Sequence, residues 1–327
     1  VRVSANVPLV KGKVGKNGAL RLEKLVPTIT HLVRKKAKVI IVTHVGRPGG
    51  RRVKKFSAAP VAKRLSKILQ KQIRFIPLTF GKEVEQAIAT MKGGEILFLE
   101  NIRFFEEELR NRPSFARKLA SLADLYINEA FAVSHRKHAS IASVPLHIPG
   151  YAGFQFQEEI QVLSKVRDNP KKPLGVIIGG IKIISKLGVI TGFAAKAHVI
   201  FIGGDTANAI IDAGRFKTLS AKEQRAVKTV RRLAKTYSSI TFPEDVVVKQ
   251  GRKFTTIPTS QLSTKNTIID VGSVSMNRLM SVMKSTSTIV WSGPLGIFEQ
   301  PVGKKASVTL ARFLARNQTG RPGTHQR

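Results

Sequence analysis

Short apolar runs alternate with longer amphipathic stretches along most of the chain. Mostly apolar runs of three to five residues are typical of strands buried on both faces, as in parallel sheets covered by helices. The stretches between them carry apolar residues at helical spacing. The pattern therefore predicts an α/β fold of doubly wound parallel sheets. The predicted strands are residues 39–42, 73–76, 96–99, 125–127, 174–178, 199–202, 240–242, 267–269 and 288–291, and the predicted helices include residues 58–70, 81–90, 113–122 and 221–237.

This rhythm is interrupted once, between residues 148 and 173. A Pro-Gly turn at residues 149–150 precedes a helical stretch over 158–166, and an Asp-Asn-Pro break follows it. A chain of 327 residues is long enough for two domains. We expect one domain over residues 1–152, a linker helix within 153–172, and a second domain over 173–316. Residues 317–327 are polar and are predicted to be a disordered tail.

Composition excludes several classes of protein. The chain has no cysteine, so disulfides, thiolate catalysis and cysteine-based metal sites are absent. No apolar run approaches the roughly 20 residues that a membrane-spanning helix needs. No signal peptide is visible, although the first residues already read as a strand, which leaves a processed or incompletely determined N-terminus open. These features predict a protein that is not secreted and that resides in the cytoplasm or an organelle matrix, such as that of the mitochondrion.

The charge is unusual for a globular protein of this size. Lys and Arg number 56 against 20 Asp and Glu, a formal net charge of +36, and both halves of the chain are basic. A single basic run is usually a solvated surface. The total favours a polyanionic partner, because self-repulsion at this charge destabilises a compact chain. With only 6% aromatic residues, stacking on single-stranded bases is not expected. The composition therefore predicts contacts to the phosphates of structured RNA.

Basic residues also follow the predicted strands of the first half. Arg47, Arg103 and Arg136 each come after an apolar run, as do His44, His135 and His138, whereas Arg2 lies within the opening strand. Ligands of parallel α/β sheets bind where the strands end. An isolated arginine in a loop is usually only solvated. Because this placement repeats from strand to strand, we expect the side chains to converge on an anion, which arginine binds with two hydrogen bonds.

Five segments of this sequence resemble the phosphoglycerate kinase family: residues 2–8 (RVSANVP), 43–48 (THVGRP), 99–104 (LENIRF), 135–138 (HRKH) and 291–299 (WSGPLGIFE). The resemblance implies two doubly wound, Rossmann-like domains joined by a helix. It also implies that Arg21 stabilises the transferring phosphoryl group. Ser4 stands where the family has an aspartate that binds the glycerate hydroxyl. The implied 3-phosphoglycerate-binding residues are Asn6, Arg21, His44, Arg47, Arg103, His135 and Arg136.

The second half contains a glycine turn with two lysines between a predicted strand and a helix. Such a turn lets backbone N–H groups and a helix N-terminus approach a phosphate. It is similar to the family's nucleotide loop, which implies catalytic roles for Lys182 and Lys186 beside Arg21. Ser185 replaces a family aspartate. Asp205 and Thr206 are predicted to be a loop pair, and no metal site is assigned. The implied nucleotide-binding residues are Gly179, Gly180, Lys182, Lys186, Ser292 and Glu299.

Three functions fit these observations. The first is a catalytically impaired family member, a pseudoenzyme that binds rRNA and neighbouring proteins in a ribonucleoprotein particle such as the ribosome and needs no cofactor. It accounts for the charge, for two replaced carboxylates, and for the family's later glycine-rich turns and C-terminal segment, which are missing here. The alternative is a working glycolytic kinase that uses ATP or ADP with Mg²⁺ and 3-phosphoglycerate. The third is a small-anion sensor without chemistry. The net charge, the replaced carboxylates and the missing segments favour the first.

Overall fold

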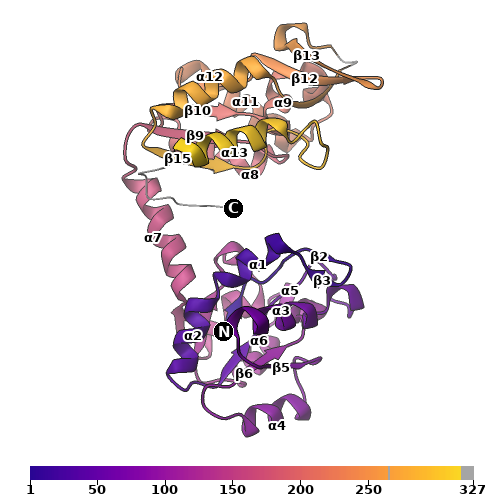
Figure 1. Ribbon diagram of the computed structural model, residues 1–327, viewed down its shortest axis with the longest axis vertical. Helices are drawn as coiled ribbons and strands as arrows, with labels where there is room; N and C mark the ends of the chain where they lie inside the picture. The colour runs from indigo at the N-terminus through magenta and orange to yellow at the C-terminus, as the bar shows by residue number, and fades with distance from the viewer. Residues whose placement is uncertain (264–265, 318–327) are drawn as a thin grey trace. The chain divides into compact units, whose positions relative to one another are not determined.

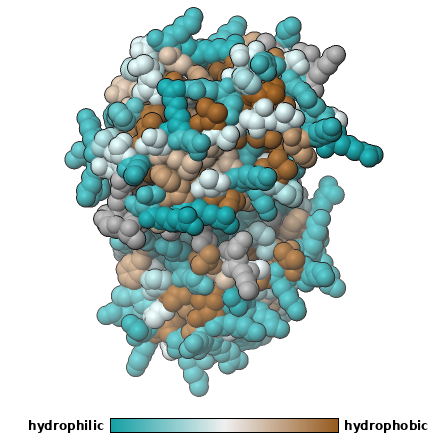
Figure 2. All heavy atoms as spheres, turned by 45° about the horizontal axis from the view of Figure 1, so that its top comes forward, coloured by the Kyte–Doolittle hydropathy of each residue, from teal (hydrophilic) through white to brown (hydrophobic). Residues whose placement is uncertain are grey.

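The computed structural model describes residues 1–263 and 266–317, so residues 318–327 of the predicted tail lie outside the described residues. The chain divides into two compact units, unit 1 over Val1–Gln161 and unit 2 over Val162–Arg327. On the face drawn in Figure 2, hydrophilic side chains cover most of the surface, and hydrophobic ones form smaller groups. No helix among the described residues is long and apolar enough to cross a membrane.

Unit 1 contains one parallel sheet in the order β5-β6-β4-β1-β7-β8, of which Figure 1 labels β5 and β6. An isolated bridge between Arg2 and Val42 joins its two halves, so β1 lies beside β4. The hairpin β2–β3 follows β1. The strands are β1 (Arg2–Val3), β2 (Leu9–Val10), β3 (Lys13–Val14), β4 (Val39–Ile41), β5 (Ile73–Ile76), β6 (Ile96–Leu99), β7 (Tyr126–Glu129) and β8 (Gly150–Ala152).

Alternate residues of these strands face opposite helical layers. In β6, Ile96 and Phe98 join the core formed with α1, α2 and α3, whereas Leu97 and Leu99 join the core formed with α4 and α6. Both faces are buried, which explains why the strands read as continuous apolar runs. The helices of unit 1 are α1 (Lys16–Glu23), α2 (Val26–Arg34), α3 (Ala59–Leu69), α4 (Lys82–Thr90), α5 (Glu106–Leu109) and α6 (Pro113–Ala120).

Unit 2 repeats the arrangement on a parallel sheet in the order β11-β10-β9-β15. Helices α8, α9 and α11 share one core with Val176 and Ile200, and α12 and α13 share the other with Ile177 and Phe201. The elements are β9 (Leu174–Ile178), α8 (Ile183–Phe193), β10 (Val199–Ile202), α9 (Gly204–Ile211), α10 (Ala213–Lys217), α11 (Ala221–Thr236), β11 (Ile240–Thr241), α12 (Ser273–Lys284), β15 (Thr288–Ser292) and α13 (Lys305–Asn317).

A second sheet of unit 2 was not predicted. Strands β12 (Asp245–Gln250), β13 (Lys253–Pro258) and β14 (Thr267–Val271) form an antiparallel sheet in the order β13-β12-β14. The run at 267–269 was predicted as a strand of a parallel sheet, and this assignment is wrong. The turn between β12 and β13 contains Gly251 at φ +59°, a conformation that glycine adopts without steric cost. Because β13 is an exposed edge strand, its polar sequence carried no apolar run to detect.

Helix α7 (Phe154–Asp168) contains the boundary between the two units. Its first turn is held by the buried carboxylate of Glu129, which accepts hydrogen bonds from the N–H groups of Gln155 (3.2 Å) and Phe156 (3.0 Å) and from the Thr28 hydroxyl. A carboxylate at a helix N-terminus satisfies N–H groups that have no partner inside the helix. The helix therefore begins four residues before the predicted stretch at 158–166.

Candidate active site

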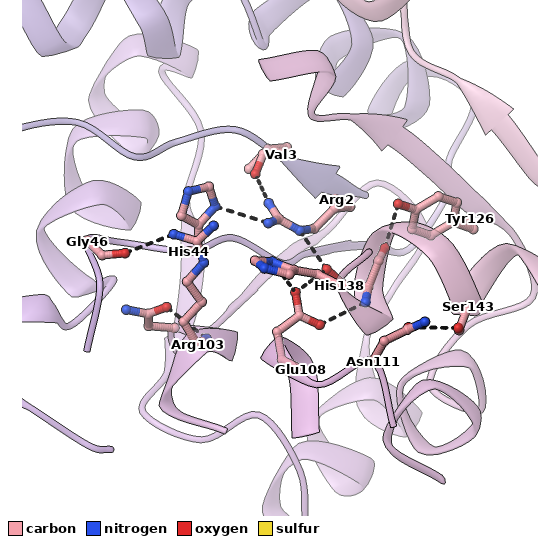
Figure 3. A network of polar contacts seen from close by, with 12 residues as sticks. Arg2, Val3, His44, Gly46, Arg103, Glu108, Asn111, Tyr126, His138 and Ser143 are labelled. Atoms are coloured by element: carbon pink, nitrogen blue, oxygen red, sulfur yellow. Dashed lines mark hydrogen bonds and ion pairs between the residues drawn. The ribbon is translucent and has the colours of Figure 1, made fainter. Parts of the chain in front are cut away.

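The loops that follow β1, β4, β6 and β7 bring the basic residues of unit 1 together (Figure 3). Their positions are fixed by hydrogen bonds between loops. Asn101, after β6, donates through Nδ2 to the carbonyls of Val45 (2.7 Å) and Phe56 (2.8 Å). Asn6, after β1, accepts the Gly46 N–H at 2.8 Å through its side-chain oxygen. The strand ends thus converge, as expected for a parallel sheet.

Arg103 lies at the centre of this cluster. Arg103 is only 3% exposed. Nη1 donates to the Gly46 carbonyl at 3.0 Å, but Nε and Nη2 are buried without a partner. Burial, followed by the charges of Arg136 and Arg2, lowers the pKa of Arg103 to about 10. Buried donors are almost always paired in native proteins, so these two groups call for acceptors from outside the protein, which a bound anion can supply.

His44 is held as a neutral side chain with a defined tautomer. Arg2, which is 1% exposed, donates from Nη2 to Nδ1 of His44 at 3.0 Å. A guanidinium can only donate, so Nδ1 is the acceptor and the ring proton sits on Nε2. Burial, and then the charge of Arg2, lowers the pKa of His44 to about 2. His44 therefore offers an uncharged N–H donor to a ligand.

The loop after β7 contributes Arg136, His135 and His138. Nε of Arg136 and Nδ1 of His138 are buried without a hydrogen-bond partner. Burial, and then Arg103, lowers the pKa of His138 to about 4. His135 is exposed and influences this group through its charge. The loop therefore adds one further unpaired arginine donor beside Arg103.

The remaining predicted residues of unit 1 lie at the border of the cluster. Arg21 is exposed and donates from Nη1 to the Asn6 carbonyl at 2.8 Å. Arg47 is exposed, and its charge contributes to lowering the pKa of Arg103 after burial, Arg136 and Arg2. The structure thus brings buried His44 and Arg103 together with the half-buried Arg136, and joins Arg21 to Asn6.

Unit 2 has a cavity of about 310 Å³ beside the glycine turn. Gly180, Gly204 and Pro294 line one part of it, and Glu299 and Asp205 line another. Lys186 donates to the Ser292 hydroxyl at 2.7 Å, and burial lowers the pKa of this lysine. Lys182 is exposed at the residue before α8. Of the predicted residues of this half, Gly180 and Glu299 therefore line the cavity, whereas Gly179, Lys182, Lys186 and Ser292 do not.

The glycines have a different role from the one predicted. The N–H of Gly179 donates to the Ser292 carbonyl at 2.8 Å, and the N–H of Gly180 donates to the Pro294 carbonyl at 2.7 Å. These donors are engaged within the protein and are not free for a phosphate. A Cβ atom on Gly179 would collide with the Pro294 carbonyl oxygen. The glycines allow the turn to approach the loop after β15, and this contact forms the wall of the cavity.

Asp205 and Thr206 lie in the first turn of α9 and not in a loop. Asp205 forms an ion pair with Arg215 at 2.9 Å, and the Thr206 hydroxyl donates to the Gly180 carbonyl at 3.0 Å. Ser185 donates to the Lys182 carbonyl at 2.7 Å. Among the described residues, no cluster of three or more His, Asp or Glu side chains is arranged to hold a metal ion.

Sequence reasoning did not identify Glu108 or Ser140. Glu108 is fully buried beneath the arginines, and Ser140 connects it to Arg2. Glu108 is the third of three consecutive glutamates in α5, and the other two are exposed. No pattern in the sequence distinguishes it from them, because a four-residue helix is too short to show periodicity.

Comparison with known proteins identifies relatives over nearly the whole chain. The sequence model of the family described as phosphoglycerate kinase matches residues 1–322. Phosphoglycerate kinases of Bartonella bacilliformis and Syntrophobacter fumaroxidans are each 38% identical, over 98% and 96% of this chain and 82% and 81% of theirs. The structure of the Coxiella burnetii enzyme shares 30% identity, and that of the Pyrococcus horikoshii enzyme 25%. Their TM-scores are 0.74 and 0.83, over 96% and 97% of this chain and 82% of each of theirs.

These comparisons overturn the favoured functional prediction. A pseudoenzyme that binds rRNA in the ribosome or another ribonucleoprotein particle is not what the relatives indicate, because they are all named as the kinase. The prediction of a polyanionic partner is wrong for the same reason. It rested on net charge, which governs solubility and long-range attraction and does not identify a ligand. The fold, the convergent arginines and the relatives agree, and the chain belongs to the phosphoglycerate kinase family.

Proposed function

We propose that this chain is a working phosphoglycerate kinase, which transfers a phosphoryl group between ATP and the carboxylate of 3-phosphoglycerate. The observation that carries the proposal is Arg103, a buried guanidinium with two unpaired nitrogens among like charges. Such a group is costly to bury without an anion. A substrate with a carboxylate and a phosphate supplies the acceptors that this cluster lacks.

The residues of unit 1 divide the work of binding this anion. Arg103 and Arg136 offer unpaired buried donors, and His44 offers a neutral N–H that adds no further repulsion. Exposed Arg47, His135 and Arg21 attract the substrate, and Asn6 holds Arg21 through its carbonyl. In the proposed reaction Arg21 neutralises charge on the transferring group, which is where phosphoryl transfer gains most from the protein. In this reading residues 1–152 are the substrate domain.

The residues of unit 2 fit a nucleotide. The cavity of about 310 Å³ is large enough for a nucleoside, and Glu299 at its edge can accept hydrogen bonds from ribose hydroxyls. Lys182 immediately precedes α8 and Lys186 lies in its first turn, where cations can bind the phosphates of ATP or ADP. Bound Mg²⁺ would neutralise phosphate oxygens. In this reading residues 173–316 are the nucleotide domain, joined to the substrate domain by the linker of residues 153–172.

The reaction needs no covalent contribution from the protein. The substrate carboxylate attacks the terminal phosphorus of ATP, the bond to the bridging oxygen breaks, and ADP leaves as the acyl phosphate forms. The protein positions the reactants and stabilises charge. Serving glycolysis, such an enzyme works in the cytoplasm or in an organelle matrix, where ATP and phosphoglycerate meet.

A coupled assay of the full chain with 3-phosphoglycerate, ATP and Mg²⁺ tests the proposal. We expect turnover that falls at least 100-fold in Arg21→Ala, because a transition-state contact is lost. Arg117→Ala replaces an exposed arginine of α6 and should leave turnover within twofold. Wild-type protein without turnover above background would reject the proposal. Equal turnover of Arg21→Ala would reject the role of Arg21.

A further inference from the structure

A buried carboxylate lies beneath the arginine cluster and contacts none of the predicted ligand-binding side chains directly (Figure 3). Glu108 of α5 is 0% exposed. Its Oε2 accepts the backbone N–H of Ser140 at 2.8 Å, and its Oε1 accepts the Ser140 hydroxyl at 2.7 Å. Ser140 lies in a single π-helical turn, Ala139–Ser143, which Tyr126 also holds by donating to the Ser140 carbonyl at 2.7 Å.

These hydrogen bonds have a fixed direction. The Ser140 hydroxyl gives its proton to Glu108, so its oxygen accepts from Nε of Arg2 at 2.9 Å. Arg2 then donates from Nη2 to Nδ1 of His44 at 3.0 Å and from Nη1 to the Val3 carbonyl. Because a guanidinium can only donate, Arg2 itself fixes the proton of His44 on Nε2, and Glu108 and Ser140 act by holding Arg2 in the position from which it donates.

Glu108 also supplies charge. Burial lowers the pKa of Arg2, and the Glu108 carboxylate opposes this effect. It likewise opposes the lowering of the pKa of Arg103 by burial, Arg136 and Arg2. Nδ1 of His138 lies 3.8 Å from the same carboxylate. Because burial lowers the pKa of His138 to about 4, this histidine is neutral near pH 7 and forms no ion pair with Glu108 there. Glu108 thus supplies negative charge to two buried guanidinium groups.

We propose that Glu108 is a positioning residue of the substrate site, which acts through Ser140 and Arg2 to hold His44 in its Nε2–H tautomer and aimed at the ligand. This inference rests on the proposed function, because the ligand is taken to be 3-phosphoglycerate. A carboxylate that only stabilised the fold would leave the His44 tautomer and ring orientation unchanged when replaced without unfolding. The two roles therefore give different results in a measurement on His44 itself.

Three variants of the full chain separate these roles. Glu108→Gln removes the charge and makes one of the two acceptors a donor, so Ser140, and through it Arg2, is no longer held in place. Ser140→Ala keeps the charge of Glu108 but removes the acceptor for Nε of Arg2. Glu107→Gln makes the same chemical change at the exposed neighbour on α5 and serves as the matched control.

The first readout is the ¹⁵N side-chain spectrum of His44 at pH 7.5 without ligand. We expect a single Nε2–H tautomer in the wild type and in Glu107→Gln, and a mixture of tautomers in Glu108→Gln and Ser140→Ala, because an Arg2 side chain that has lost its anchor moves away from Nδ1. The second readout is calorimetric titration with 3-phosphoglycerate. Glu108→Gln and Ser140→Ala should bind it roughly tenfold more weakly than the wild type, which is the loss expected for one disturbed hydrogen bond to a charged group. Ser140→Ala keeps the experiment decisive if Glu108→Gln does not fold.

A single Nε2–H tautomer in folded Glu108→Gln and Ser140→Ala would overturn the inference. So would an affinity equal to that of Glu107→Gln. If the wild type does not bind 3-phosphoglycerate at all, the proposed function fails on its own, and the tautomer measurement, which needs no ligand, still decides whether Glu108 positions His44.

Discussion

Replacing Arg103 with methionine should make the protein more stable without ligand and less stable with it. Burial and neighbouring cations lower the pKa of Arg103 to about 10. At about 1.4 kcal/mol per unit, this shift corresponds to about 3 kcal/mol of destabilisation of the charged form. The cost is fully present below pH 10, where folded and unfolded chains are both protonated, and disappears only as the folded state loses the proton at higher pH. Methionine removes this cost.

The substitution also loses a favourable contact. The hydrogen bond from Nη1 to the Gly46 carbonyl, at 3.0 Å, contributes about 1–2 kcal/mol. The net gain without ligand is therefore about 1–2 kcal/mol. For a unit of this size, 1 kcal/mol shifts the melting temperature by about 2–4 °C. We expect the transition of unit 1 to rise by about 2–8 °C in Arg103→Met.

Bound 3-phosphoglycerate should reverse the order of stability of the wild type and Arg103→Met. At 3-phosphoglycerate equal to 100 times the wild-type Kd, the wild type gains about 2.7 kcal/mol. Arg103→Met loses two charge-assisted hydrogen bonds, from Nε and Nη2, each worth about 1.5 kcal/mol. Its affinity falls about 100-fold, and its gain falls to about 0.4 kcal/mol. The wild type should then be more stable by about 1 kcal/mol.

Scanning calorimetry with and without 3-phosphoglycerate measures both effects. Arg117→Met, at an exposed position of α6, is the matched control and should change stability by less than about 0.5 kcal/mol. An Arg103→Met protein that melts below the wild type without ligand would refute the reasoning that burying Arg103 costs more free energy than its contacts within the protein return. A ligand-induced gain equal to that of the wild type would refute its role in anion binding.

Three further outcomes can be measured. Ser4→Asp restores the carboxylate that the family carries at this position and should lower KM for 3-phosphoglycerate about tenfold in the coupled assay, since one charged hydrogen bond is gained; an unchanged or higher KM contradicts this. Gly179→Ala places a Cβ against the Pro294 carbonyl and should cost about 2–3 kcal/mol in urea unfolding followed by Trp291 fluorescence; wild-type stability would show that the turn can yield. Burial lowers the pKa of His44 to about 2 in the folded protein, so the unfolded chain takes up the proton first and stability falls as pH drops below about 6.5. His44→Gln should therefore flatten the dependence of stability on pH by up to about 1.4 kcal/mol per pH unit. Ring resonances of His44 that titrate between pH 5 and 8 in the folded protein would contradict this prediction.

The parallel sheets could be predicted because strands that are buried on both faces have mostly apolar sequences. Residues 73–76, 96–99, 174–178 and 199–202 are strands over the predicted ranges. The last three are apolar and buried on both faces because a helical layer covers each side, whereas the strand at 73–76 lies at the edge of its sheet and exposes Arg74. The predicted helices differ from the observed ones by two residues at most, except the helix at α7. A capping contact from Glu129 extends that helix toward its N-terminus, and such a long-range contact leaves no local signal.

The site could be predicted only in part, for physical reasons. Residues that follow strands converge because the sheet is parallel, so His44, Arg103 and Arg136 could be placed together from the sequence. The engagement of the Gly179 and Gly180 N–H groups depends on a loop more than 100 residues away, which local pattern does not report. Glu108 was missed because its burial results from the packing of α5 against the π-helical turn at Ser140.

The failure of the charge argument shows what a guanidinium must do to indicate a ligand. An exposed arginine such as Arg117 keeps its hydration and costs little free energy, so it requires no partner however many similar residues the surface carries. Arg103 has exchanged water for a buried place beside Arg136 and Arg2, and only one of its nitrogens found an acceptor in the protein. In the proposed function, the free energy spent on burying Arg103 is offset when an anion of the right size and shape accepts hydrogen bonds from Nε and Nη2. A net charge of +36 averages over both kinds of arginine and therefore loses the distinction on which function depends.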